Sequence, residues 1–309
     1  SPSGVVPVRV QGPPATKSWI DATASRGDLL YIAATPIFPN GVVYVYTYPQ
    51  RKLVGTLTGF AEPFGECTDS AGDVFIVAFS NTSSSLSSTI YEYAHGGTSP
   101  IATLSDPNVA FSCAVDPMTG NLAAAGDGVA VYQHAAGNPT IYNSSDAFKF
   151  CGYDNHGNLY LTARSDHYGN QAQLVRLSSG SNEFDQIQLG TKLYAGIRLW
   201  PSVQWDGKHM TVSSNPNGNP ISIYRLRISG SSATVIGTTE VSSAKNNYSG
   251  QTWIRGDTII GTGNTKRAYE SAFFWRYPTG GVARREIKQV GNVRNPEASG
   301  VTVSVARSR

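Results

Sequence analysis

The chain has 309 residues, of which 40% are hydrophobic and only 15% charged, with 32 Gly, 17 Pro and 16 Tyr. Charged residues make up roughly 25% of an average globular protein, so this composition is typical of a turn-rich β protein and favours a secreted location over a cytosolic one. No run of about 18 apolar residues is present, which excludes a transmembrane helix, and three cysteines are too few for a disulfide-built scaffold.

Charge is unevenly distributed along the chain. The net charge is +3, but residues 1–197 carry 9 Lys/Arg and 15 Asp/Glu, whereas residues 198–309 carry 15 and 6. If successive segments occupy successive sectors of a ring, one side is acidic and the other basic. This pattern favours an anionic ligand on one flank, or self-association through opposed patches.

The first 17 residues predict an extended N-terminal arm. Val6, Val8 and Val10 alternate weakly before Pro13 and Pro14. The arm is either a frayed tail or a strand that pairs with a sheet edge, in this molecule or in a neighbour. Since the chain begins at Ser1 without a charged and apolar leader, we expect that a signal peptide has been removed or that the chain has been trimmed.

Residues 18–309 predict a single domain built from a repeat. Each repeat has a Gly at a turn just before an apolar strand, and the spacings between these Gly are 45, 48, 37, 50 and 49 residues. That period fits a four-stranded blade. The marker residues are Gly27, Gly72, Gly120, Gly157, Gly207 and Gly256.

Strands with aromatic and β-branched alternation, such as residues 43–46 and 90–93, follow each marker, and a weaker edge strand ends each unit. Six units fit residues 18–292, and residues 295–304 form a first strand without a second. We therefore predict an all-β, six-bladed β-propeller of four-stranded antiparallel blades. Its C-terminal strand completes the first blade and closes the ring.

The motif Pro63-x-Gly65-x-x-x-Asp69-x-x-Gly72, followed by Asp-Val-Phe-Ile-Val, resembles the NHL-type propellers. That group includes virginiamycin B lyase-like, SMP-30-like (gluconolactonase-like) and strictosidine-synthase-like proteins. Asp116-Pro-Met-Thr-Gly120 and Asp154-Asn-His-Gly157 repeat the motif, whereas the units at Asp206 and Asp257 depart from it. Within the group the chain looks most similar to secreted bacterial propellers that carry Leu53-Val-Gly-Thr-Leu-Thr-Gly and Tyr93-Ala-His-Gly-Gly.

Ligands of propellers usually meet the face where the loops from fourth to first and from second to third strands converge. Here those loops hold aromatic and basic side chains, which suit stacking on sugar rings or clamping of an anionic polymer. Any tyrosine-rich surface would also supply such a set. The predicted ligand-binding residues are Glu66, Phe148, Tyr168, Trp200, Tyr248 and Arg267.

The leading hypothesis is a non-enzymatic binding protein with a polysaccharide or protein partner and no nucleic acid. The resemblance also implies a hydrolase or lyase, with Ca²⁺ or an acid–base pair at the channel mouth near Glu66. A calcium site needs several converging oxygens, and only Glu66 and Glu297 lie near first-strand starts. A third hypothesis is an extracellular layer or fibre that assembles through the arm and the opposed charges.

The cysteines and the repeated aspartates allow both structural and chemical roles. Cys113 and Cys151 lie at equal distances before their turn aspartates, so a bridge between them is one option; the other is that Cys67, Cys113 and Cys151 are buried free thiols. Asp69, Asp116 and Asp154 predict turns, in which the carboxylate accepts from following backbone amides. Asn81, Asn143 and Asn247 match the N-glycosylation pattern.

Overall fold

The fold is all-β, as the sequence predicts. The computed structural model describes residues 17–37, 40–82, 85–164, 171–195, 200–215, 220–242, 246–265, 270–292 and 297–307. Apart from three short 3-10 turns, regular structure in these segments is β-strand; the turns are η1 (Ala24–Arg26), η2 (Gln133–Ala135) and η3 (Val290–Asn292). No described helix is long and apolar enough to cross a membrane. The predicted N-terminal arm lies outside the described residues except for Lys17.

Three of the sheets contain four or five strands. The first has the order β1-β4-β3-β2-β26, with β1 (Trp19–Ile20), β2 (Leu29–Ile37), β3 (Asn40–Thr47), β4 (Leu53–Phe60) and β26 (Glu297–Ser304). The second contains β5 (Glu62–Thr68), β6 (Val74–Thr82), β7 (Ser85–Tyr93) and β8 (Ala102–Asp106). The third contains β9 (Ala110–Val115), β10 (Leu122–Gly126), β11 (Gly128–Tyr132) and β12 (Thr140–Tyr142).

The remaining strands form a 13-stranded sheet. It contains β13 (Ala147–Tyr153), β14 (Leu159–Arg164), β15 (Gln171–Leu177), β16 (Phe184–Leu189) and β17 (Leu193–Tyr194). It continues with β18 (Val203–Trp205), β19 (Met210–Ser214), β20 (Ile221–Ser229) and β21 (Ser232–Ser242), and then β22 (Asn246–Arg255), β23 (Thr258–Thr265), β24 (Glu270–Arg276) and β25 (Gly280–Lys288). Short parallel pairings of β21 with β16 and with β25 join antiparallel groups at their outer strands.

Strand β2 shows why the apolar runs in this sequence are continuous. Leu30 and Ile32 belong to a core cluster shared with β24 and β26, whereas Leu29 and Tyr31 belong to a cluster shared with β6. Successive side chains of a strand point to opposite faces of the sheet. A sheet packed between two neighbours therefore needs apolar residues at every position.

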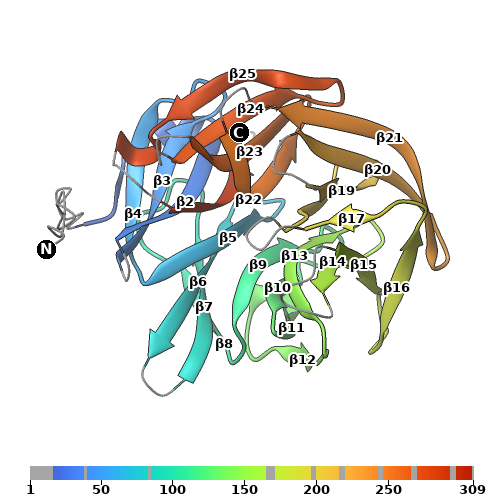
Figure 1. Ribbon diagram of the computed structural model, residues 1–309. Coiled ribbons are helices and arrows are strands. Elements are labelled where there is room, and N and C mark those ends of the chain that lie inside the picture. The colour runs from blue at the N-terminus through green and yellow to red at the C-terminus, as the bar shows by residue number, and fades with distance from the viewer. Residues whose placement is uncertain are drawn as a thin grey trace, which may run out of the picture.

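The first strands of these groups form the centre of the molecule. Strands β5, β9, β13, β18, β22 and β26 contact one another in that order, and β26 in turn contacts β5. Strand β26 pairs with β2 from Leu29–Ser304 to Thr35–Glu297, which is the closing contact that the sequence predicts. Figure 1 shows the result: the sheets surround a common centre, and the blue strands β3 and β4 lie beside the red strands β24 and β25.

Glycines let the inner strands approach backbone to backbone. A Cβ atom on Gly65 of β5 would lie 2.6 Å from the carbonyl oxygen of Phe111 in β9, and one on Gly300 of β26 would lie 2.0 Å from that of Phe64. Contacts this short are sterically forbidden, so any larger residue would push the inner strands apart.

The turn aspartates have the structural role that the sequence predicts. The Oδ1 atom of Asp69 accepts hydrogen bonds from the backbone N–H groups of Ala71 and Asp73, at 2.9 and 2.8 Å. Asp116 and Asp154 accept from the residues two positions further on in the same way. Their carboxylates are therefore used in shaping turns at the end of the ring opposite the loop face.

The cysteine pairing differs from the options that the sequence offered. Cys67 and Cys113 form a disulfide, and Cys151 is a buried free thiol. Cys113 and Cys151 occupy the same register, so they point to the same side of two successive sheets and fall into different core clusters. Cys67 lies one position out of that register and points to the opposite face, which brings its sulfur toward Cys113.

Two glutamine side chains join inner strands by hydrogen bonds to the backbone of another strand. Gln251 of β22 accepts a hydrogen bond from the Glu66 N–H at 3.0 Å and donates one to the Glu66 carbonyl at 2.8 Å. Gln204 of β18 makes the same pair of bonds with Ile254 of β22, at 2.6 and 3.1 Å. A side-chain amide thus bonds backbone groups of another first strand: Gln204 bridges the neighbouring strands β18 and β22, and Gln251 reaches from β22 past β26 to β5.

Candidate functional site at the mouth of the ring

Three side chains from three first strands meet at the loop end of the ring. Phe64, Phe111 and Lys149 each lie five residues before a turn aspartate, so β5, β9 and β13 present them at the same height. The two phenyl rings meet edge to face with centroids 5.4 Å apart. Side chains from three separate sheets can touch only where those sheets converge, at the mouth of the ring.

The ammonium group of Lys149 is held against both rings. Its Nζ atom lies 3.5 Å from the centre of the Phe111 ring and 5.0 Å from that of Phe64, within the range of cation–π attraction. Burial lowers the pKa of Lys149 to about 8, although the carboxylates of Glu62 and Asp127 favour its charged form. Near neutral pH this lysine is therefore a cation that loses its proton easily.

A second aromatic and basic pair lies at the same end. The guanidinium carbon of Arg164, the last residue of β14, lies 4.7 Å from the centre of the Trp200 ring. Arg164 pairs with Ala147 at the loop end of β13, two residues before Lys149. Arg164 is only 1% exposed, so its charge is buried beside the half-buried Trp200 ring, and Lys149 with the two phenyl rings is the part of this end that suits a sugar ring bearing an acidic group.

The structure places the predicted site residues in different surroundings. Trp200 is half-buried at the mouth, but Phe148 is only 1% exposed and packs in the core with Phe184. Tyr168 and Arg267 lie outside the described residues, as does the side chain of Tyr248. Of the predicted set, Trp200 alone among the described side chains presents part of its surface at this end.

Glu66 is fully buried between sheets and does not face the mouth. Neither of its carboxylate oxygens accepts a well-formed hydrogen bond, and burial raises its pKa well above the usual range, with the Ala33 backbone N–H opposing the rise. Glu66 occupies the same strand register as Cys113, whose side chain also points into the space between two sheets. The carboxyl group is thus enclosed by protein in this structure, and an acid–base role near Glu66 stays a prediction.

Sequence reasoning missed Phe111 and Lys149. The sequence contains a pattern that could have found them, because both lie five residues before a turn aspartate, as Phe64 does. No three His, Cys, Asp or Glu side chains in the described segments are grouped as metal ligands would be. The calcium hypothesis stays a prediction.

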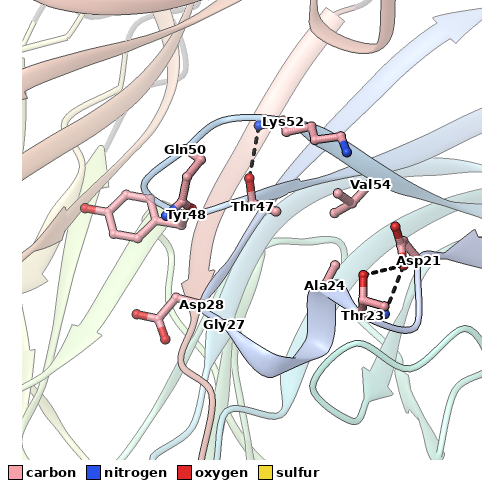
Figure 2. A pocket seen from close by; sticks show the side chains of 10 residues that line it. All are labelled: Asp21, Thr23, Ala24, Gly27, Asp28, Thr47, Tyr48, Gln50, Lys52 and Val54. Atoms are coloured by element: carbon pink, nitrogen blue, oxygen red, sulfur yellow. Dashed lines mark hydrogen bonds between the residues drawn. The ribbon is translucent and has the colours of Figure 1, made fainter.

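A pocket of about 290 Å³ lies at the opposite end of the first sheet, beside η1 and the turn between β3 and β4. Figure 2 shows its polar lining: Asp21 accepts hydrogen bonds from the N–H and hydroxyl of Thr23, and Thr47 accepts one from the Lys52 N–H. The side chains of Asp21, Thr23 and Thr47 are thus already hydrogen-bonded within the lining.

The inner ring of first strands and the sheets around it define a β-propeller. Two solved structures support this class. The WD40 domain of a coronin from Toxoplasma gondii has a TM-score of 0.51 at 13% identity, over 92% of this chain and 74% of that one. A protein from Lactobacillus plantarum has a TM-score of 0.53 at 11% identity, over 90% and 99%. At such low identity the likeness concerns the fold alone. No family model matches the sequence, and no curated protein does.

Proposed function

We propose that the chain is a secreted, six-bladed β-propeller of the NHL type that binds an acidic polysaccharide at the mouth of its ring. The observation that carries the binding proposal is the position of Lys149 against Phe64 and Phe111. In the free protein the ammonium group occupies the aromatic faces. On binding, a sugar carboxylate pairs with Lys149 while the sugar ring stacks on the phenyl faces that the ammonium leaves.

The architectural part of the proposal has separate support. Four-stranded antiparallel groups recur along the chain, and the Asp-x-x-Gly turns follow the NHL-type pattern. The Cys67–Cys113 disulfide and the low content of charged residues support an oxidising, extracellular or periplasmic compartment. Thiol titration of protein isolated from its native compartment tests this: one thiol, reactive only after unfolding, is expected, and three would contradict it.

The binding proposal predicts proton uptake. At pH 8 about half of the Lys149 side chains are neutral, and pairing with a carboxylate raises the pKa of the lysine. Calorimetry with polygalacturonate in two buffers of different ionisation enthalpy should therefore show protons taken up at pH 8. Neutral dextran should give no such uptake.

Variants locate the site. Lys149→Ala should weaken polygalacturonate binding by about tenfold, through loss of one charge-assisted contact, and Phe111→Ala should weaken it through loss of stacking. Lys208→Ala changes an exposed lysine at the turn end of the ring and serves as the matched control. Equal affinities for the wild type, Lys149→Ala and Lys208→Ala would contradict binding at the mouth.

The lowered pKa of Lys149 favours one second candidate, a lyase. In this reaction the neutral amine takes the proton at C5 of a uronate, a C4–C5 double bond forms as the C4–O glycosidic bond breaks, and the departing oxygen takes a proton from the lysine ammonium or from water. Incubation with polygalacturonate above pH 8 would then raise the ultraviolet absorbance of the unsaturated product. A flat trace under saturating binding would eliminate the lyase and leave the binding proposal intact.

A further inference from the structure

A second, smaller groove lies at the other end of the ring, where the first and last sheets meet. Its volume is about 120 Å³. One wall is the turn between β3 and β4, which contains Tyr48 and Arg51, and the other is formed by β24 and β25. The groove shares only Tyr48 with the polar pocket of Figure 2. None of the residues that line the mouth takes part in it.

Four arginines line this groove: Arg51, Arg276, Arg284 and Arg285. No ion pair joins any of them to a carboxylate of the described residues, whereas Arg255 and Arg307 have carboxylate partners at 3.9 and 3.7 Å. The one carboxylate in the lining, Asp257, accepts a hydrogen bond from the Thr258 hydroxyl. Arginine cannot lose its proton in a protein, so the lining carries four positive charges against the one negative charge of Asp257.

Arg51 occupies a backbone position that suits glycine. The turns Tyr48-Pro49-Gln50-Arg51 and Tyr277-Pro278-Thr279-Gly280 are equivalent, because the N–H groups of Tyr48 and Tyr277 donate to the carbonyls of Asp28 and Asp257 at 2.8 and 2.7 Å. Arg51 has a φ of 65° where Gly280 has 69°. A left-handed conformation is unfavourable for a residue with a Cβ atom. A glycine at position 51 would therefore make the turn itself more stable than the arginine does.

The guanidinium group of Arg51 is fixed toward the groove. One of its terminal nitrogens donates to the Pro49 carbonyl at 2.6 Å, and its central carbon lies 5.4 Å from the centre of the Phe274 ring. A guanidinium held against an aromatic ring loses less freedom when it binds a ligand than a freely rotating one. Arg51 is thus pre-organised for an anion that the more exposed Arg284 and Arg285 can also reach.

We propose that this groove binds a tetrahedral oxyanion, either free sulfate or phosphate or a sulfate or phosphate ester carried by a polymer. The planar fork of arginine donates two parallel hydrogen bonds to such an anion. The small volume admits one oxyanion group. The surrounding exposed strands leave room for the rest of a larger molecule outside the groove.

Calorimetry on the full chain at low ionic strength tests the site, with four probes: sodium sulfate, sodium phosphate, dextran sulfate and neutral dextran. Arg51→Gly should fold at least as well as the wild type, since glycine adopts positive φ freely, and should weaken oxyanion binding by about tenfold. Arg285→Gln should weaken it as well. Arg227→Gln, which changes an exposed arginine of β20 outside the groove, should bind like the wild type.

The probes separate the two sources of the anion. Binding of free sulfate or phosphate that Arg51→Gly weakens assigns a free oxyanion. Binding of dextran sulfate alone, again weakened by Arg51→Gly, assigns an ester on a polymer. Equal affinity in the wild type, Arg51→Gly and Arg285→Gln overturns the proposal, as does the absence of binding to all three charged probes.

Discussion

The inner strand β5 is joined to other inner strands by two different kinds of chemistry, one on each side. Toward β9 the joint is covalent, through the Cys67–Cys113 disulfide. Toward β22 and β26 the joint is the buried amide of Gln251, which bonds the backbone of Glu66 and also accepts from the Val301 N–H at 3.3 Å. Beside the amide lies the buried carboxyl group of Glu66, without a hydrogen-bond partner.

The difference indicates where the ring is sensitive to its surroundings. A disulfide responds to redox conditions, whereas a buried amide and an unpartnered carboxyl group respond to substitution and to pH. Strand β26 follows β2 by more than 250 residues in the chain, so the second joint lies at the closure of the ring. We therefore expect the joint at the ring closure to depend more strongly on pH and on substitution than the disulfide does.

Removing the covalent joint should have the largest effect. A cross-link between residues 46 apart stabilises the folded chain by about 4 kcal/mol in the chain-entropy description. We expect the double variant Cys67→Ala, Cys113→Ala to lose about this much free energy of unfolding, measured by urea titration. Cys151→Ala, which leaves the disulfide intact, should lose about 1 kcal/mol. Equal losses in both would show that the cross-link contributes nothing beyond its packing.

Breaking the amide joint should come next. Gln251→Ala leaves the Glu66 N–H and carbonyl buried without partners, at a cost of about 3 kcal/mol. Gln188→Ala, which changes an exposed glutamine on β16, should stay within about 0.5 kcal/mol of the wild type. A small loss in Gln251→Ala, measured in the same urea titration, would mean that β5 and β26 are held mainly by their glycine contacts.

The Glu66 carboxyl group should make the amide joint sensitive to pH. Its folded-state pKa is raised by burial, so above the unfolded value of about 4.3 the unfolded chain gives up a proton that the folded chain keeps. Stability therefore falls as pH rises from that value through the folded pKa. Glu66→Gln should remove this fall and match the wild type near pH 4. Parallel curves for both proteins from pH 4 to 8 would contradict a raised pKa.

Lys149 contacts Phe64 and Phe111, which lie on the two strands that the disulfide joins. Its protonation therefore tests whether stability also depends on pH on this side of β5. Its folded pKa of about 8 lies below the 10.4 of an exposed lysine, so stability should rise with pH between these values, where the unfolded chain holds the extra proton. NMR titration of the lysine side chains should show one midpoint near 8. Phe111→Ala should move this midpoint upward by exposing the ammonium group, and an unchanged midpoint would mean that the ring does not shield it.

The repeat made the strands, the aspartate turns and the closing contact predictable, because each depends on local residues at a fixed spacing. The disulfide was not predicted because equal spacing suggests Cys113 and Cys151, while the alternation of side chains brings Cys67 and Cys113 together. Glu66 was placed at the mouth for the same reason. The spacing gave its distance from the turn aspartate, but it did not give the face of the sheet to which its side chain points.

The arginine groove shows a different limit. Arg51 and Arg276 are separated by more than 200 residues and meet only because the ring closes. The excess of basic residues after position 197 indicated a positive side but could not say which arginines share a groove. The loops that hold Tyr168 and Arg267 lie outside the described residues, so their part in the mouth stays a prediction.

The closing strand also has a consequence for the synthesis of the protein. Until residues 297–304 leave the ribosome, the edge of β2 has no partner and the first sheet stands open. An unpaired strand edge is prone to pair with other chains. A ring that closes last therefore needs the nascent chain to be shielded or carried in an unfolded form until translation has passed residue 304.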